Sequence, residues 1–121
     1  MANKKVVFIS VPYSRDTKRG EQLSLLGGRY VRTVGKTPFS PVFNFQNFYD
    51  NGNEYDAVIE DCNVMLARCD EALFINDGGL SNGQRIELAV AQELRKEILI
   101  TESIVLLDLV RFAVMDKEVM L

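Results

Sequence analysis

The fold is best predicted from residues 71–87, which read EALFINDGGLSNGQRIE. The apolar run Glu71–Ile75 predicts a buried strand, and the glycines within Asn76–Leu80 predict a loop. Apolar periodicity from Ser81 to about Lys96 then predicts a helix. In parallel α/β sheets, ligands bind where such a loop leads from a strand into its helix. The stretch therefore predicts a fold class and the position of a site together.

The helix has a clear start signal. Ser81 is a favoured N-cap residue, and Gln84 stands three residues later, where a capping box places Glu or Gln. Both residues are explained by capping alone. They predict the helix boundary without requiring a function.

Glu87 is the unusual residue of this helix. It shares a face with Gly83 and with the predicted core residues Val90, Ala91 and Leu94, where an unpaired carboxylate is costly. Helical side chains lean toward the N-terminus, so Glu87 leans over Gly83, which has no side chain to fill that space. Helix N-termini also favour anions. A functional carboxylate and a structural salt bridge are two interpretations of equal weight.

Composition excludes several classes of protein. The 121 residues suit a single domain over residues 1–121, and 47% hydrophobic with 26% charged residues is typical of a globular protein. The net charge of −3, without a long basic stripe, argues against a nucleic-acid polymer as partner. No apolar run approaches the ~20 residues that span a bilayer. The N-terminus lacks a signal-peptide pattern, so we expect a cytoplasmic protein with no membrane partner.

The chain contains no histidine, which rules out Ser–His and Cys–His nucleophile pairs and argues against a zinc site. Cys62 and Cys69 are seven residues apart, about 10.5 Å along a helix, which is too far for a disulfide. Both are expected to be buried thiols. Acid–base chemistry must therefore come from carboxylates, Tyr or Lys, and we expect neither a metal nor a cofactor.

The N-terminal third predicts a strand, a helix and a second strand. Lys5–Ser10 is apolar and β-branched, and Pro12 ends it. Ser14 is expected to cap a helix that ends at Gly35. The adjacent Gly27 and Gly28 predict close packing on either the sheet or a neighbouring chain.

The second strand is expected over Thr37–Phe43, and its two prolines place it at a sheet edge or end it early. The following loop carries Phe45, Phe48 and Tyr49. These aromatic rings either stack on a flat ligand, form an interface or pack into the core.

The remaining pattern completes an alternating order. A helix is expected over Glu54–Arg68, a fourth strand over Glu97–Thr101, and a final apolar helix over Ile104–Met115 with Ile104, Leu107, Val110 and Ala113 or Val114 inward. Such an order predicts a small doubly wound (flavodoxin/Rossmann-like) parallel sheet of four to five strands with helices on both faces. If the first and third strands are neighbours, the loops Val11–Arg15 and Asn76–Ser81 face one crevice. The strong apolar character of the final segment suggests burial in an oligomer.

Several motifs stand in a recognisable order: Ser10-Val-Pro-Tyr-Ser14 after the first strand, Asp61 in the helix before the third, Cys69-Asp70 leading into it, and Ser81-x-Gly83-x-x-x-Glu87 after it. In this combination, residues 5–101 resemble the nucleoside 2-deoxyribosyltransferase-like superfamily. That superfamily includes 2'-deoxynucleoside 5'-monophosphate N-glycosidases and many small uncharacterised relatives.

The resemblance implies specific roles. Glu87 matches the glutamate that attacks the anomeric carbon, and Asp61 matches an aspartate that contacts the sugar or assists the base. Tyr13 matches a first-loop tyrosine that places the sugar or stacks on the base. Ser81 matches the serine that binds a 5'-phosphate. The other implied substrate-binding residues are Ser10, Pro12, Ser14, Arg15 and Gly83.

Two positions depart from the family pattern. The glycine-rich first loop of the hydrolases is replaced by Val11–Asp16, and a frequent glycine two residues before the glutamate is replaced by Arg85. These departures indicate a different nucleotide or a lost activity.

Three functional hypotheses follow. The first is N-glycosidic cleavage or transfer on a 2'-deoxynucleoside or its 5'-monophosphate through a Glu87 glycosyl-enzyme. The second is a non-catalytic protein that binds a nucleotide or ADP-ribose-like signal in the same crevice, and the third is an interaction protein that keeps an old fold. The resemblance also implies a homodimer or larger homo-oligomer.

Overall fold

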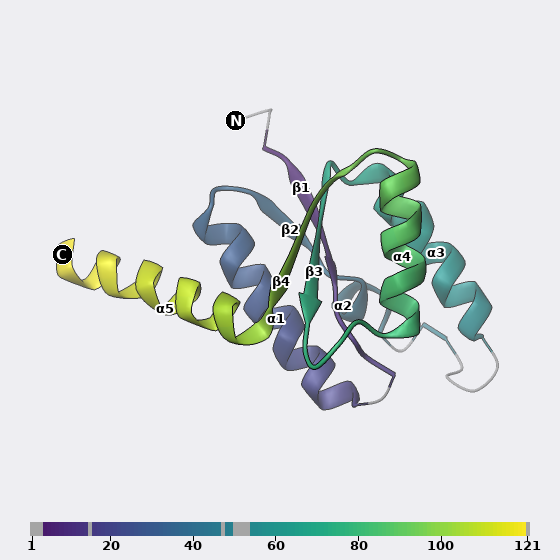
Figure 1. The fold of residues 1–121 in the computed structure, drawn as a ribbon, viewed down its shortest axis with the longest axis horizontal. Helices are drawn as coiled ribbons and strands as arrows, with labels where there is room; N and C mark the ends of the chain where they lie inside the picture. Colours follow the sequence, from purple (N-terminus) through teal and green to yellow (C-terminus); the bar gives the residue numbers. More distant parts are fainter. Residues whose placement is uncertain (1–3, 15, 47, 50–53, 121) are drawn as a thin grey trace.

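The computed structural model describes residues 4–14, 16–46, 48, 49 and 54–120 (Figure 1). Its sheet has four parallel strands in the order β2-β1-β3-β4. The strands are β1 (Val6–Ser10), β2 (Thr37–Phe39), β3 (Glu71–Asn76) and β4 (Glu97–Glu102). This confirms the predicted α/β class, with the second strand and its Pro38 at a sheet edge.

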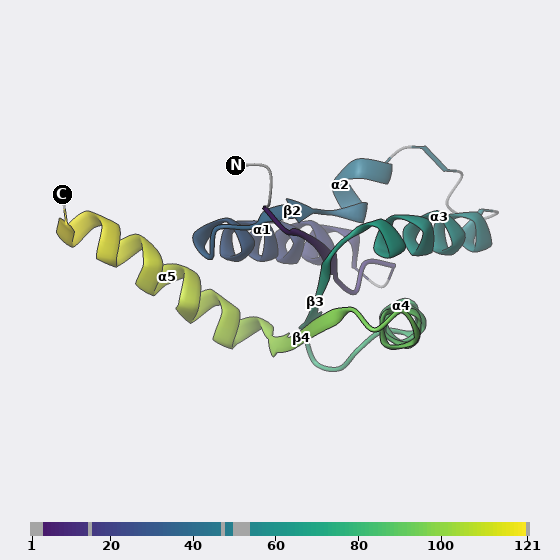
Figure 2. The ribbon, with the colours of Figure 1, turned by 90° about the horizontal axis from the view of Figure 1, so that it is seen from above.

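Helices cover both faces of the sheet, as expected. Figure 2 shows α1 (Thr17–Thr33) and α5 (Ser103–Met120) on one side, with α3 (Tyr55–Arg68) and α4 (Asn82–Glu93) on the other. A short helix, α2 (Pro41–Phe45), follows β2. Among the described residues, no helix is long and apolar enough to cross a membrane.

Alternate residues of the central strands form two cores. Val7 and Ile9 of β1 and Leu73 and Ile75 of β3 join Leu23, Val31 and Leu106 on the side of α1 and α5. Phe8, Ala72 and Phe74 join Cys62, Leu66, Cys69 and Ala91 on the side of α3 and α4. Both cysteines are free and buried, as predicted.

Three predicted boundaries are corrected. Asp16, not Ser14, is the N-cap of α1, because its side chain accepts the backbone N–H of Arg19 at 3.0 Å. The second strand ends at Phe39, since Ser40 caps α2 and Pro41 has the φ that suits a first helical position. Helix α4 ends at Glu93, short of the predicted Lys96.

Three predicted core positions also differ. Leu94 is 44% exposed, because it lies at the C-cap of α4 and no longer shares the buried face. Among the side chains of α5 that the structure describes, Leu106 and Val110 are buried, whereas Ile104 and Leu107 are exposed. Ala113 and Val114 belong to the part of α5 whose side chains the structure does not describe.

Gly27 lets α1 lie close to the sheet. A Cβ built there would be 2.9 Å from Ile9 Cγ2 and 3.0 Å from Ile75 Cδ1, both fully buried. At Gly28 the nearest atom is 4.0 Å away, on Pro38. Of the two predicted alternatives, the structure shows packing of α1 on the sheet. Gly27 is the glycine that makes this close packing possible.

These neighbours give a matched test. Gly27→Ala should lower the free energy of unfolding by about 1 kcal/mol or more, because the added methyl overpacks the core. Gly28→Ala should raise it by about 0.5–1 kcal/mol through helix propensity. Denaturant unfolding of both variants measures these changes, and equal effects would contradict the close approach at Gly27.

Candidate functional site

The first and third strands lie side by side, which brings the two predicted site loops to one edge of the sheet. Val7, Phe8, Ile9 and Ser10 pair in parallel with Glu71, Ala72, Leu73 and Phe74. The loops that leave the carboxyl ends of β1 and β3 therefore start as neighbours. This is the position where open α/β sheets bind their ligands.

Glu87 reaches this edge from α4. Its carboxylate Oε1 accepts a hydrogen bond of 2.8 Å from the Ser10 hydroxyl at the end of β1. Ser10 is 2% and Glu87 8% exposed, so this bond joins two buried side chains from elements far apart in the sequence. The sequence singled out both residues, but the contact between them is a product of the fold.

Gln84 holds the helix to the strands. Its side-chain amide donates to the carbonyl oxygens of Ser10 at 3.1 Å and Ile75 at 2.8 Å, the ends of β1 and β3. Its Oε1 accepts the backbone N–H of Ser81 at 2.9 Å, while the Ser81 hydroxyl accepts the backbone N–H of Gln84. The predicted capping box is thus confirmed. The additional bonds to both strands were missed, because the capping pattern carries no sign of them.

The protonation of Glu87 is set mainly by burial. Removal from water raises the pKa of this carboxyl to about 7 from an ordinary 4.5, and the hydrogen bond from Ser10 partly opposes the rise. In the described part of the chain, no Lys or Arg forms an ion pair with Glu87. The structure therefore does not support the interpretation of Glu87 as part of a salt bridge. Its buried carboxyl titrates near neutral pH.

The space above Gly83 is small. A Cβ at this position would lie 3.8 Å from Ile59 Cδ1, 3.9 Å from the Tyr55 hydroxyl and 3.9 Å from Ser81 Oγ. These are ordinary van der Waals distances. The expected vacancy beside Glu87 therefore has room for about a methyl group, and its walls come from α3 and from Ser81, the N-cap of α4.

Asp61 lies on the same side of the sheet. Its Oδ2 accepts a hydrogen bond from the Tyr49 hydroxyl. The adjacent Cys62 has a thiol pKa raised to about 12, first by burial and then by the negative charges of Glu87 and Asp61. Cys62 shares a core cluster with Ala91 of α4, so Asp61 stands next to a residue packed between α3 and α4.

The loop after β1 is only partly described. Pro12 is buried, Tyr13 is half-buried and Ser14 is exposed, whereas Arg15 lies outside the described residues. A Cβ at Gly20 would be 2.7 Å from Tyr13 Cδ1, so the tyrosine ring packs against the first turn of α1. Arg85 is exposed on α4.

An ion pair holds the second loop in place. Arg19 of α1 donates to both carboxylate oxygens of Asp77, from Nε at 3.0 Å and from Nη2 at 2.9 Å. Ser103 at the start of α5 donates to the same carboxylate at 2.8 Å. The sequence did not predict these contacts, because Arg19, Asp77 and Ser103 lie far apart in the chain.

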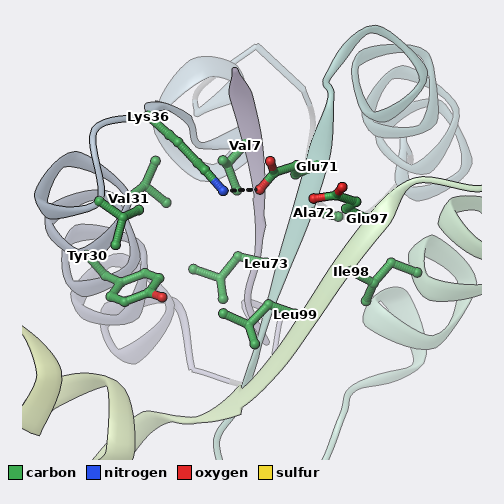
Figure 3. A pocket seen from close by; sticks show the side chains of 11 residues that line it. Val7, Tyr30, Val31, Lys36, Glu71, Ala72, Leu73, Glu97, Ile98 and Leu99 are labelled. Carbon is green, nitrogen blue, oxygen red and sulfur yellow. Dashed lines mark hydrogen bonds and ion pairs between the residues drawn. The ribbon is translucent and has the colours of Figure 1, made fainter. Parts of the chain in front are cut away.

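In the described part of the chain, two hollows lie near the sheet, and Glu87 lines neither of them. One, of about 280 Å³, lies between α1 and the strands on the side facing away from α4 (Figure 3). There Lys36 donates to Glu71 at 2.7 Å across an otherwise mostly apolar wall. The other, also about 280 Å³, lies where β3 and β4 end and is lined by Asn76, Gly78, Gly79, Glu102, Ser103 and Ile104. In the described ranges, His, Cys, Asp and Glu form no group of three that could hold a metal ion.

The sheet order and the two helical layers define the class, an α/β protein with the fold of 2-deoxyribosyltransferases. A 2-desoxiribosyltransferase from Leishmania mexicana superposes with a TM-score of 0.63 at 18% identity, covering 81% of this chain and 64% of that one. A 2-deoxyribosyltransferase from Bacillus psychrosaccharolyticus gives 0.64 at 16% identity, covering 80% and 72%. The chain thus spans less than two thirds of the first of these proteins.

The sequence comparison gives the family. Residues 5–101 match the model described as "Domain of unknown function (DUF7768)", and the chain belongs to this family. The match ends before α5 begins. A CMP N-glycosidase from Clostridium botulinum, BcmB, superposes with a TM-score of 0.47 at 20% identity over 81% of this chain and 69% of that one, which is too distant to guide interpretation. Comparison of the sequence with curated proteins gave no match.

The burial of Glu87 predicts a pH-dependent stability. Above pH 4.5 the unfolded chain ionises this carboxyl, whereas the folded chain keeps it protonated up to about pH 7. Between these values the folded protein should lose stability relative to Glu87→Gln, by about 3 kcal/mol in total, with no further loss above pH 7. Urea unfolding of both proteins across pH 4–8 measures the difference. A difference that stays constant over this range would show that Glu87 titrates normally.

Proposed function

We propose that the protein cleaves or transfers the N-glycosidic bond of a 2'-deoxynucleoside or its 5'-monophosphate, with Glu87 as the nucleophile. The observation that carries this proposal is the buried Glu87 carboxylate at the carboxyl edge of the sheet, held by the Ser10 hydroxyl. The shared fold of the two deoxyribosyltransferases supports the substrate class. In this proposal, residues 1–121 form one domain. The protein acts in the cytoplasm and uses no metal or cofactor.

The proposed reaction begins with attack of a Glu87 oxygen on the anomeric carbon. A carbon–oxygen bond to Glu87 forms as the carbon–nitrogen bond breaks, and the base leaves with the electron pair and acquires a proton. Water then hydrolyses the glycosyl-enzyme, or a second base accepts the sugar. Asp61 is assigned to the sugar or the departing base.

The remaining proposed roles concern binding. Ser81 at the start of α4 suits a phosphate, because helix N-termini favour anions. Ser14 and Arg15 are assigned to the same group, and Tyr13 with Pro12 to the sugar or base. Gly83 supplies clearance beside Glu87, and Ser10 orients the nucleophile. Because attack requires the ionised form of Glu87, and its pKa is about 7, the rate should rise with pH through neutrality.

The decisive experiment is incubation with all deoxynucleosides and their 5'-monophosphates, with chromatography of the free base. Glu87→Gln should lower base release by at least a factor of about 10³, because it removes the nucleophile and keeps the shape. Glu93→Gln, at an exposed position of the same helix, is the matched control and should retain activity. Unchanged turnover in Glu87→Gln would exclude this mechanism. Nucleotide binding by the wild type without base release would favour the non-catalytic alternative.

We also propose that the chain forms a homodimer or larger homo-oligomer through α5 and the open side of β4. Leu106 and Val110 of α5 pack in the core, yet Ile104 is 65% and Phe112 67% exposed on other faces of the helix. Leu99 of β4 is 45% exposed in the neighbouring hollow. Exposed apolar surface of this extent is normally covered by a partner, and a second copy would bury both surfaces together. Because α5 follows β4 directly, the two surfaces are continuous and can meet their counterparts across a two-fold axis.

The self-association has its own test. Phe112→Glu should shift the chain to a monomer at concentrations where the wild type is larger, because a charge cannot be buried there without a partner. Phe48→Glu replaces another exposed phenylalanine, 71% exposed in the connection between α2 and α3, and should leave the mass unchanged. Light scattering after size-exclusion chromatography measures both. A monomeric wild type would exclude the oligomer.

A further inference from the structure

Tyr49 is fixed by a series of aromatic contacts that starts in the core. Phe8 of β1 stacks on Phe39 of β2 with ring centroids 6.1 Å apart. Phe39 meets Phe45 of α2 edge-on at 6.3 Å, and Phe45 meets Tyr49 edge-on at 6.0 Å. Edge-to-face and offset contacts at these distances have preferred geometries. The position of the Tyr49 ring is therefore set by the sheet, although Tyr49 lies in the connection between α2 and α3.

At the end of this aromatic series, the Tyr49 hydroxyl forms a hydrogen bond with the carboxylate of Asp61. It donates its proton to Oδ2 of Asp61, and this bond is the main reason that the pKa of Tyr49 is raised to about 12. The phenol therefore remains a donor throughout the pH range of enzymatic activity. Among the described residues, no hydrogen bond reaches the other oxygen of Asp61, Oδ1.

The position of Asp61 connects this pair to the candidate site. Asp61 lies on α3 beside Cys62, which shares a core cluster with Ala91, one turn after Glu87 on α4. The wall of α3 also reaches α4 near Gly83, through Ile59 and the Tyr55 hydroxyl. Asp61 thus lies on the helix that faces Glu87. Its Oδ2 accepts a hydrogen bond from Tyr49, and its Oδ1 accepts none from the described residues.

We propose that Tyr49 is a positioning residue, which holds Asp61 by Oδ2 so that Oδ1 is presented to the substrate. This inference rests on the proposed function for its catalytic consequence, and on the Tyr49–Asp61 hydrogen bond for its structural part. The sequence does not assign it, because Tyr49 is one of three loop aromatics for which core packing is favoured over ligand stacking or an interface. In this arrangement, Tyr49 acts through Asp61 and does not touch the reacting atoms.

The first measurement is a double-mutant cycle on base release. Tyr49→Phe removes the hydroxyl and keeps the ring contact with Phe45, so kcat should fall about 10- to 100-fold through misplacement of Asp61. In an Asp61→Asn background, Tyr49→Phe should cause little further loss, because the residue through which it acts is already altered. The same fold-loss in both backgrounds would overturn the positioning role. Tyr30→Phe, on the opposite face of the sheet, is the matched control and should leave kcat unchanged.

The second measurement does not require activity. Tyrosinate absorbance of the wild type, corrected with Tyr49→Phe, should show Tyr49 almost un-ionised at pH 11, and Asp61→Asn should make it ionise near pH 10. Far-UV circular dichroism at each pH checks that the chain stays folded. If Tyr49 ionises at the same pH in Asp61→Asn as in the wild type, the Tyr49–Asp61 hydrogen bond is contradicted. The proposed function is not affected by that result. Conversely, a wild type that releases no base overturns the proposed function and the positioning role with it, whatever the titration shows.

Discussion

The side chain of Gln84 is the interaction on which this structure depends most. A single buried amide satisfies the carbonyl oxygens at the ends of β1 and β3 and the backbone N–H of Ser81. Buried backbone groups without partners are costly, so these three bonds fix the start of α4 against two neighbouring strands. Displacement of this amide would free both strand ends and the helix cap at once.

The environment of Glu87 follows from that constraint. With α4 anchored one turn earlier, Glu87 is largely removed from water and accepts a hydrogen bond from the Ser10 hydroxyl. Burial then raises its pKa to about 7, while Ser10 favours the ionised form. The pKa of this buried carboxyl is thereby kept close to neutral pH, so small changes in its surroundings alter its charge. Such perturbed pKa values are associated with functional groups.

The two faces of the sheet are organised differently. On the face of α3 and α4, aromatic contacts, the Tyr49–Asp61 hydrogen bond and Glu87 occupy one continuous layer. On the other face, α5 leaves the end of β4 and projects outward, as Figures 1 and 2 show, so Leu99 remains open. Chemistry is proposed for the first face and self-association for the second. The separation allows one to be altered without the other.

The sequence by itself determined the alternating strand–helix order, the capping box at Ser81 and the unusual position of Glu87. These features depend on neighbours within a few residues, where periodicity and capping chemistry are local. Only the tertiary structure decided the Ser10–Glu87 bond, the role of Gln84 and the Arg19–Asp77 ion pair. The outward course of α5 was also beyond prediction, because its apolar residues fit several buried faces equally well. Each of these contacts joins residues far apart in the chain, and their pairing depends on how the strands are ordered in the sheet.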